Sequence, residues 1–352
     1  AQKAQIERLA AEFANELESL GVRVGKLEKK LDNVTITGEV RFSNYTYDKL
    51  FANKENLRSR IFINGQVNDR WKYTGMFENT QNLRFNDSEG GVNLRRAWVT
   101  GSIGDVGVRL GRFPFKVAYG AIVDNEADGI DLTYKKGNFD VGLFAVRPET
   151  SSLWLGSVAT IVNNAITTIG SPAAQKVQVL GGQVGYKFNK NLDLRVAYFD
   201  IKGKGDYAVM DIDDSSLEVI LGYKFSKELS AYAEYIRAGR KAEYTLPQSL
   251  GGGTYRDSKT GWAAGVVYST LSRAKANTYA VRANYYDIPT GALIDHTSEL
   301  DFGVGFKGYS IGASYMLAKN VELAVDYFDF EGRKNLHNLE EDLLWTKLFF
   351  YF

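Results

Sequence analysis

The spacing of apolar residues divides the chain into two parts, and the first part has a helical period. Over residues 1–34 the apolar positions follow one another at steps of three and four: Ile6, Leu9, Phe13, Leu17, Leu20, Val24, Leu27, Leu31 and Val34. This spacing is that of a coiled-coil seam, with one four-residue stutter near Phe13. The flanks are charged, and Gly21 and Gly25 weaken a lone helix, so we expect partner chains to hold it. We therefore predict a coiled-coil stalk; a surface helix packed on its own domain is the alternative.

From residue 35 to the end of the chain, the apolar positions instead recur at every second residue. The first such run has Val34, Ile36, Gly38, Val40 and Phe42. Half-buried β-strands have this pattern. Three segments, 186–198, 223–235 and 315–327, repeat one design: a strand ends in Tyr, a short polar turn with Lys follows, and the next strand ends in Tyr. Tyr at both ends of an apolar band is typical of the aromatic girdles of a membrane barrel.

The connections between these strands alternate between short and long. Besides the turns of the three repeats, short turns are predicted at 68–70, 103–105, 136–138 and 269–275. Long polar stretches separate them, at 48–56, 79–91, 148–175, 202–216, 238–259, 287–299 and 331–341. Short turns on one side and long loops on the other are the signature of an outer-membrane barrel, here of about sixteen antiparallel strands over residues 35–352. A soluble propeller or sandwich is the alternative, but it needs no Tyr at both strand ends.

Composition and charge exclude several other classes. The 352 residues carry Lys+Arg 43 against Asp+Glu 42, a net charge of +1, whereas nucleic-acid-binding proteins have a clear basic excess. There is no Cys, and the only two His are His296 and His337, so we expect no metal site, no cofactor and no catalytic residues. No apolar run reaches the roughly 18–20 residues of a membrane helix, which excludes a helical membrane protein.

A closed barrel of this size leaves an aqueous lumen lined by the polar half of each strand. Among these positions, Arg41, Arg58, Arg60 and Arg96 lie within the first four strands, which are neighbours, and are predicted to form a basic ladder, with Arg109 further along. The connection 112–129 combines apolar residues with an acidic cluster, so we expect it to fold inward and to face the ladder across a constriction. From this connection the predicted pore-lining residues are Arg112, Asp124, Glu126 and Asp128. For the ladder, the alternative is a solvated barrel face without a role in selectivity. For the connection 112–129, the alternative is an ordinary surface loop.

Three stretches resemble known families. Gly111-Arg-Phe-Pro-Phe115, together with Arg95-Arg-Ala-Trp98 before it, resembles the region of general porins that leads into their constriction loop. The last eight residues, 345–352, resemble the C-terminal signal that barrel-assembly machinery recognises, with Phe350 and Phe352 as its aromatic positions. The junction 17–42, in which the stalk runs directly into the first strand, is similar to OmpM-type porins, which carry an S-layer-homology domain.

These resemblances imply a homotrimeric outer-membrane porin of a diderm bacterium, with its stalk in the periplasm and lipopolysaccharide around its barrel. They also imply attachment to peptidoglycan through the S-layer-homology domain, but Ala1 already lies in the predicted stalk, so that domain is absent here. We predict passive diffusion of small hydrophilic solutes and ions. A barrel that is plugged and serves only as an anchor, and a membrane-embedded enzyme with a Ser/His or Asp/His site, are the two rival predictions.

Overall fold

The computed structural model describes most of the chain from residue 33 onward. The described residues are 13–14, 16, 33–85, 87–88, 91–148, 158–162, 165–169, 176–204, 212–239, 243–245, 254–294, 296–300, 305–334 and 339–352. Within the predicted stalk, Phe13, Ala14 and Glu16 have helical backbone. The seam residues Leu17, Leu20, Val24, Leu27 and Leu31 lie outside the described residues, so the stalk stays a prediction. No helix among the described residues is long and apolar enough to span a membrane.

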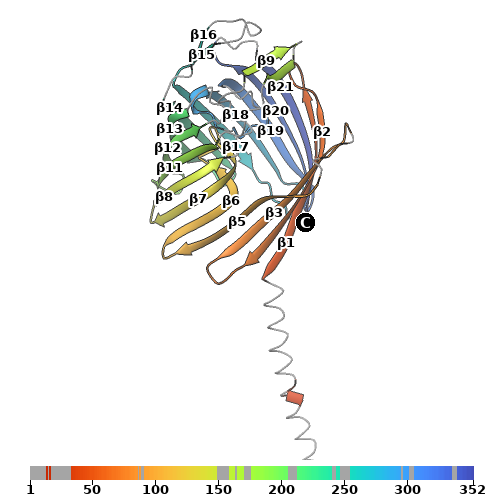
Figure 1. The fold of residues 1–352 in the computed structure, drawn as a ribbon. Coiled ribbons are helices and arrows are strands. Elements are labelled where there is room, and N and C mark those ends of the chain that lie inside the picture. Colours follow the sequence, from red (N-terminus) through yellow and green to blue (C-terminus); the bar gives the residue numbers. More distant parts are fainter. Residues whose placement is uncertain are drawn as a thin grey trace, which may run out of the picture.

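The main sheet of the described residues is a closed antiparallel barrel (Figure 1). Its wall consists of β1 (Val34–Tyr47), β2 (Lys54–Gln66), β3 (Lys72–Asn82), β5 (Asn93–Ile103), β6 (Val106–Lys116), β7 (Asp124–Lys136), β8 (Phe139–Pro148), β11 (Lys176–Lys187), β12 (Leu192–Lys204), β13 (Ile212–Lys224), β14 (Leu229–Ala238), β17 (Thr260–Ser269), β18 (Tyr279–Ile288), β19 (Phe306–Ala318), β20 (Val321–Gly332) and β21 (Glu340–Tyr351). Each strand pairs with its neighbours in chain order, and β1 pairs with β21 to close the wall. The seventeenth strand of this sheet, the two-residue β4 (Asp87–Ser88), pairs only with β3. The prediction of about sixteen antiparallel strands is confirmed.

The two ends of the barrel differ in their connections. At one end short turns join β2 to β3, β5 to β6, β7 to β8, β11 to β12, β13 to β14, β17 to β18 and β19 to β20, as predicted. Two of these turns use a glycine in the left-handed region, Gly104 (φ 58°) and Gly137 (φ 59°), where a side chain would strain the backbone. The long connections lie at the other end and include the hairpin of β9 (Val158–Val162) and β10 (Ala165–Ile169) and that of β15 (Glu243–Thr245) and β16 (Thr254–Arg256).

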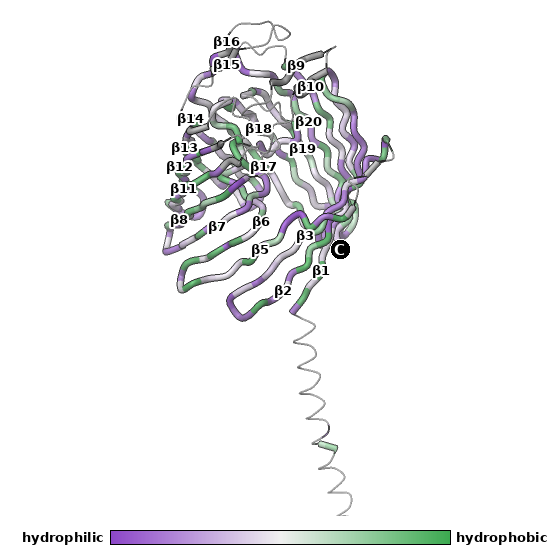
Figure 2. The backbone as a smooth tube through the Cα atoms, viewed as in Figure 1, coloured by the Kyte–Doolittle hydropathy of each residue, from purple (hydrophilic) through white to green (hydrophobic). Residues whose placement is uncertain are grey.

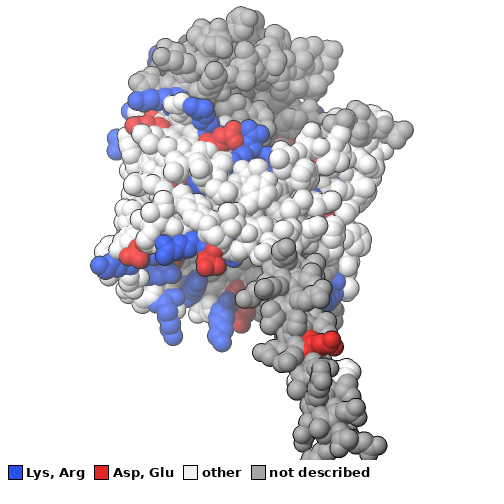
Figure 3. Space-filling view, turned by 60° about the horizontal axis from the view of Figure 1, so that its bottom comes forward, with Lys and Arg blue, Asp and Glu red and all other residues white. Residues whose placement is uncertain are grey.

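Hydrophobic and hydrophilic residues alternate along many of the strands (Figure 2). Since successive side chains of a strand point to opposite sides, the wall has two different faces. On β12, for example, Val196 and Tyr198 are exposed, whereas Ala197 and Phe199 are fully buried. Exposed aromatic residues pair across neighbouring strands near the rims, as in the stack of Trp262 on Tyr285 (ring centroids 4.7 Å apart). In Figure 3 a broad belt of largely uncharged side chains lies between upper and lower zones of Lys, Arg, Asp and Glu. The outer face therefore has the apolar band that a lipid bilayer requires.

Candidate functional site

The connection between β6 and β7 folds into the barrel as a two-stranded ribbon. Beyond the pair Gly111–Gly129 the two strands continue to pair, but Phe113 and Phe115 are buried. Phe115 packs edge-on against Phe144 of the inner wall, with ring centroids 5.0 Å apart. Gly111 has φ +124°, and an added Cβ would overlap the carbonyl oxygen of Ala97, so glycine is required where the ribbon leaves the wall. The inward fold expected from the apolar content of this connection is what the structure has.

A second connection, between β18 and β19, also folds inward and contacts the ribbon. It contains a short 3₁₀ helix, η2 (Thr290–Ala292), and the buried Ile294. The Ile294 N–H donates to the carbonyl oxygen of Ile122 at the ribbon tip (3.0 Å), and the Thr297 hydroxyl donates to Asp124 Oδ2 (2.6 Å). From the sequence, residues 287–299 are predicted only as a long polar loop. The apolar residues within this loop are the signal that this prediction missed.

Next to Ile294, His296 is enclosed by this second segment. Burial, and in second place the charge of Lys116, lowers the pKa of His296 to about 3, so the imidazole is neutral at ordinary pH. Its Nδ1 accepts the Ser298 N–H at 2.9 Å, and the ring meets Tyr286 edge-on. His296 is 3% exposed and packs inside this segment. His337 lies outside the described residues.

The predicted basic ladder is present on the inner face of β1 and β2. Arg41 lies directly across from Arg58 in the β1–β2 register. Arg58 Nη2 lies 2.9 Å from Glu39 Oε1, and Arg60 Nη1 lies 3.6 Å from the same oxygen. Arg41 has no ion pair among the described residues; its Nη2 donates to the Tyr45 hydroxyl at 3.4 Å. The positive charges of Arg58 and Arg60 are thus partly compensated by carboxylates of the wall. The charge of Arg41 is not compensated by an ion pair among the described residues.

The ladder continues on β5 and reaches the ribbon there. The register of β3 and β5 shifts between Met76 and Phe77, and this irregularity brings both Arg95 and Arg96 to the inner side. Arg95 is ion-paired with Glu78 and with Glu126, and Arg96 Nη2 lies 3.3 Å from Glu126 Oε1. Arg95 was not among the predicted residues, because strict alternation sends one of two adjacent residues outward.

Of the predicted acidic cluster, Glu126 alone contacts the arginines of β5, Arg95 and Arg96. Asp124 pairs instead with Lys116 (2.8 Å) on the same ribbon. Asp128 and Arg112 form a two-bonded ion pair with each other (both bonds 2.7 Å), and their register positions match those of Leu110 and Ile130 on the outer face. Both side chains are about half exposed. The prediction that Arg112 and Asp128 line the lumen is therefore corrected.

Two further groups of predicted residues lie elsewhere in the barrel. Arg109 is on the inner face, where it pairs with Asp131 (2.7 Å) and lies over the Phe113 ring at the base of the ribbon. At the C-terminus, Phe350 and Phe352 are exposed, and the Phe352 backbone pairs with Gly38 of β1. Their role as an assembly signal stays a prediction.

On the wall opposite the ribbon, the strands next to the barrel closure add further charges. Lys347 and Arg282 both pair with Asp326. The Lys347 ammonium lies 3.4 Å from the centre of the Trp345 ring, and Arg41 Cζ lies 5.1 Å from it. A cavity of about 280 Å³ opens between these groups and the two inward segments, lined among others by Tyr119, Tyr232, Asn284, Glu299 and Trp345.

The charged groups of the inner wall named above include more cations than carboxylates. The cations are Arg41, Arg58, Arg60, Arg95, Arg96, Arg282 and Lys347, of which Arg282 and Lys347 line the cavity. The carboxylates are Glu39, Glu78, Glu126, Asp326 and Glu299, of which Asp326 and Glu299 line it. Within this set the positive charges exceed the negative charges by two, and anionic and cationic groups are in direct contact.

Comparisons with known proteins agree with this architecture. A family model described as Gram-negative porin matches residues 10–335. Two multiply substituted variants of Rhodopseudomonas blastica porin have similar folds, at 16% identity with TM-scores of 0.52 and 0.51. A structure described as "Asymmetric conductivity of engineered proteins" has 17% identity and a TM-score of 0.53. Each alignment covers 91% of this chain and 100% of the other chain. A search of curated protein sequences finds no significant match.

Proposed function

Since the chain belongs to the Gram-negative porin family, and so forms a channel of the bacterial outer membrane, we propose that it passes small hydrophilic solutes and ions by passive diffusion. The observation that carries this proposal is the contact of Glu126, on the inward ribbon, with Arg95 and Arg96 of the wall. The ribbon narrows a lumen that sixteen strands would otherwise leave wide. Permeation is then controlled by the width and charge of this constriction.

The surplus of positive charge supports a weak preference for anions. Most of the arginines have a carboxylate within ion-pair distance, so the field of each is largely compensated at a few ångströms. Arg41 is the exception and sits at the edge of the cavity beside Trp345. We therefore expect inorganic anions to pass somewhat faster than cations of similar size.

Conductance of the purified protein in planar bilayers tests the proposal. We expect stepwise ohmic channels and, in a KCl gradient, a reversal potential slightly displaced toward that of chloride. Insertion without channels would instead favour the anchor with a plugged barrel. A reversal potential displaced toward potassium would contradict the charge assignment but leave the channel function intact.

We also propose that the porin is a trimer held partly by a coiled-coil stalk of the OmpM type, with residues 1–34 in the periplasm. The seam spacing supports this, as does the start of β1 at Val34, which is also the last apolar position of the helical series. In the parent protein, an S-layer-homology domain ahead of the stalk would tether the outer membrane to peptidoglycan. Light scattering in mild detergent tests the assembly, and a monomer would contradict it.

The orientation has a separate test. If the long connections face outward, protease added to intact cells should cut within residues 148–175 or 238–259 and spare residues 1–34. Cleavage of the stalk in intact cells would reverse the orientation.

A further inference from the structure

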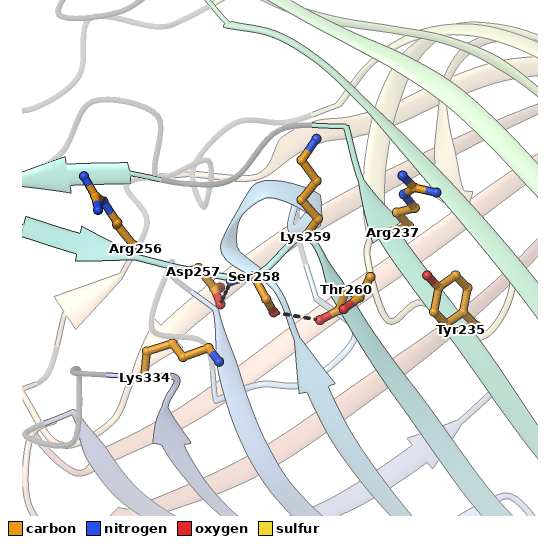
Figure 4. A pocket seen from close by; sticks show the side chains of 8 residues that line it. All are labelled: Tyr235, Arg237, Arg256, Asp257, Ser258, Lys259, Thr260 and Lys334. Atoms are coloured by element: carbon orange, nitrogen blue, oxygen red, sulfur yellow. Dashed lines mark hydrogen bonds between the residues drawn. The ribbon is translucent and has the colours of Figure 1, made fainter.

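Two cavities of the described structure differ in the charge of their lining. The bay beside the ends of β14 and β20, drawn in Figure 4, is lined by four cationic side chains and one carboxylate. The lumen cavity of about 280 Å³ has two cations, Arg282 and Lys347, and two carboxylates, Glu299 and Asp326. The lumen cavity is therefore electrically balanced, whereas the bay is strongly basic.

The charged groups of the lumen cavity are already engaged in contacts with the wall. Arg282 and Lys347 both pair with Asp326. The Glu299 carboxylate accepts a hydrogen bond from the Tyr45 hydroxyl at 3.0 Å. A charged solute would have to compete with these charge-assisted contacts, whereas an uncharged solute leaves them intact. The lining therefore favours an uncharged ligand.

Uncharged polar groups form a connected row along the same part of the wall. The Tyr232 hydroxyl of β14 donates to Asn284 Oδ1 of β18 at 3.2 Å, and Asn284 Nδ2 donates to the Ser310 hydroxyl of β19 at 3.2 Å. All three side chains line the cavity. An amide has two N–H donors, and a hydroxyl oxygen has two lone pairs besides its own donor, so these bonds do not exhaust either kind of group. Donors and acceptors that alternate in this way match the hydroxyl groups of a polyol.

An aromatic platform lies beside this row. Tyr119, from the tip of the ribbon, stacks on Tyr232 with ring centroids 3.9 Å apart and an interplanar angle of 14°. Tyr232 in turn lies against Gly265 of β17, where an added Cβ would overlap its ring. Tyr119 is nevertheless 40% exposed and lines the cavity. The face of its ring that is turned away from Tyr232 is therefore accessible to a solute.

The backbone of the ribbon tip is strained where it presents this ring. Ala118, directly before Tyr119, has φ +50°, in the left-handed region that residues other than glycine rarely adopt. The Gly120 N–H donates to the carbonyl oxygen of Val117 at 2.9 Å and closes the turn. Strain of this kind persists only where surrounding contacts impose it, and it is concentrated at functional sites. The fold thus holds Tyr119 in place at an energetic cost.

We propose that the lumen cavity is a binding site for a neutral sugar, a mono- or disaccharide, on its way through the channel. The flat C–H face of a pyranose ring would pack on Tyr119, and the hydroxyl groups at its edge would bond with Asn284 and Ser310. The volume of about 280 Å³ is at the lower end of cavities that hold small ligands, which excludes longer saccharides. The proposal rests on the proposed channel function and names the class of solute that this part of the wall recognises.

Conductance of the folded full-length protein in planar bilayers, with glucose added to the KCl solution, tests the proposal. A bound sugar narrows the lumen, so the conductance should fall to a plateau as glucose is added, with half-saturation in the millimolar range. The matched probe is sorbitol, which has a similar size and a similar number of hydroxyl groups but no ring. Sorbitol should give only the small linear decrease that viscosity causes.

Substitutions separate the aromatic platform from the polar row. Tyr119→Leu removes the ring and should raise the half-saturating glucose concentration about 5- to 10-fold, whereas Tyr119→Phe keeps the ring and should stay within about two-fold of the wild type. Asn284→Ala should raise it about five-fold through lost hydrogen bonds. The control is Asn64→Ala on β2, whose Oδ1 likewise accepts a hydroxyl donor, that of Thr74 (2.9 Å), but which is not part of the cavity lining. It should change the value less than about two-fold.

Four outcomes would overturn the sugar site: equal effects of glucose and sorbitol, an unchanged half-saturation in Tyr119→Leu, an equal loss in Asn64→Ala, or saturation by the anion gluconate at the same concentration as glucose. Each variant is first tested for channels in KCl alone. Channels without a saturable glucose effect would overturn the site and leave the channel function intact. Absence of channels from the wild type would overturn both, because the site rests on that function.

Discussion

Two carboxylates only two residues apart on β7, Glu126 and Asp128, lie in opposite environments. Glu126 is 2% exposed and bridges Arg95 and Arg96 inside the barrel, whereas Asp128 is half exposed and pairs with Arg112 on the outer side. Both are ion-paired acids of the same connection. Their difference shows that position relative to the ribbon hinge, and not residue type, decides which charges reach the lumen.

The hinge itself should be the most sensitive point of this arrangement. Gly111→Val places a branched side chain at φ +124° and against the backbone of Ala97 and Trp98, at a cost of roughly 2–4 kcal/mol in folding free energy. We expect the ribbon to detach, which would make single-channel conductance larger and noisier. Gly65→Ala is the control, because an added Cβ there meets only the Asn33 carbonyl oxygen at 3.9 Å. Wild-type conductance in Gly111→Val would contradict the role of the hinge.

The second inward segment should make barrel stability depend on pH through His296. In the unfolded chain this residue binds a proton below about pH 6.5, but in the folded chain its pKa is about 3. The unfolded state therefore binds more protons between these values, and the free energy of unfolding falls as pH falls, by up to about 3 kcal/mol at pH 4. His296→Leu removes this contribution, so urea titrations at pH 8 and pH 4 should show a smaller loss for the variant. Equal losses would mean that His296 is not enclosed.

Neutralising the ladder should produce the largest change in selectivity. The triple variant combines Arg41→Gln, Arg58→Gln and Arg60→Gln. Glu39 and Glu78 then lose most of the positive charge that compensates them. The surplus of positive charge becomes a deficit. One charge about 8 Å away is worth roughly 0.5 kcal/mol in water, so three should change the cation-to-anion permeability ratio about ten-fold toward cations. Reversal potentials in dilute KCl measure this ratio. An unchanged ratio would place these arginines away from the narrow part of the pore.

Single substitutions sharpen the comparison of the two carboxylates. Glu126→Gln removes one lumen charge and should shift the permeability ratio about two-fold toward anions. Asp128→Asn removes the same charge from the outer side and should leave the ratio unchanged, which makes it the matched control. Equal shifts in both variants would show that the ribbon does not separate inside from outside.

Much of this architecture follows from local patterns, and the remainder depends on contacts that those patterns do not contain. Alternation and the Tyr-flanked turns predicted the strand number and the short-turn end, because each strand exposes one face to lipid and one to water. Arg95 was missed because the β3–β5 irregularity breaks the alternation on which the prediction relied. Arg112 and Asp128 were assigned to the lumen because the sequence does not reveal that the ribbon leaves the wall only after Gly111. Trp345 and Lys347 approach Arg41 only through the pairing of β1 with β21.

The salt concentration should distinguish the lumen charges from the outer pair Arg112–Asp128, and this is the smallest of the expected effects. The Debye length falls from about 10 Å at 0.1 M to about 3 Å at 1 M, so an ion in the lumen feels a wall charge several ångströms away much less in concentrated KCl. The shifts of the arginine variant and of Glu126→Gln should therefore shrink severalfold between 0.1 M and 1 M KCl. Asp128→Asn should show no shift at either concentration. Shifts that persist unchanged at 1 M would mean that these substitutions act by reshaping the pore, because a change of width is insensitive to screening whereas a change of field is not.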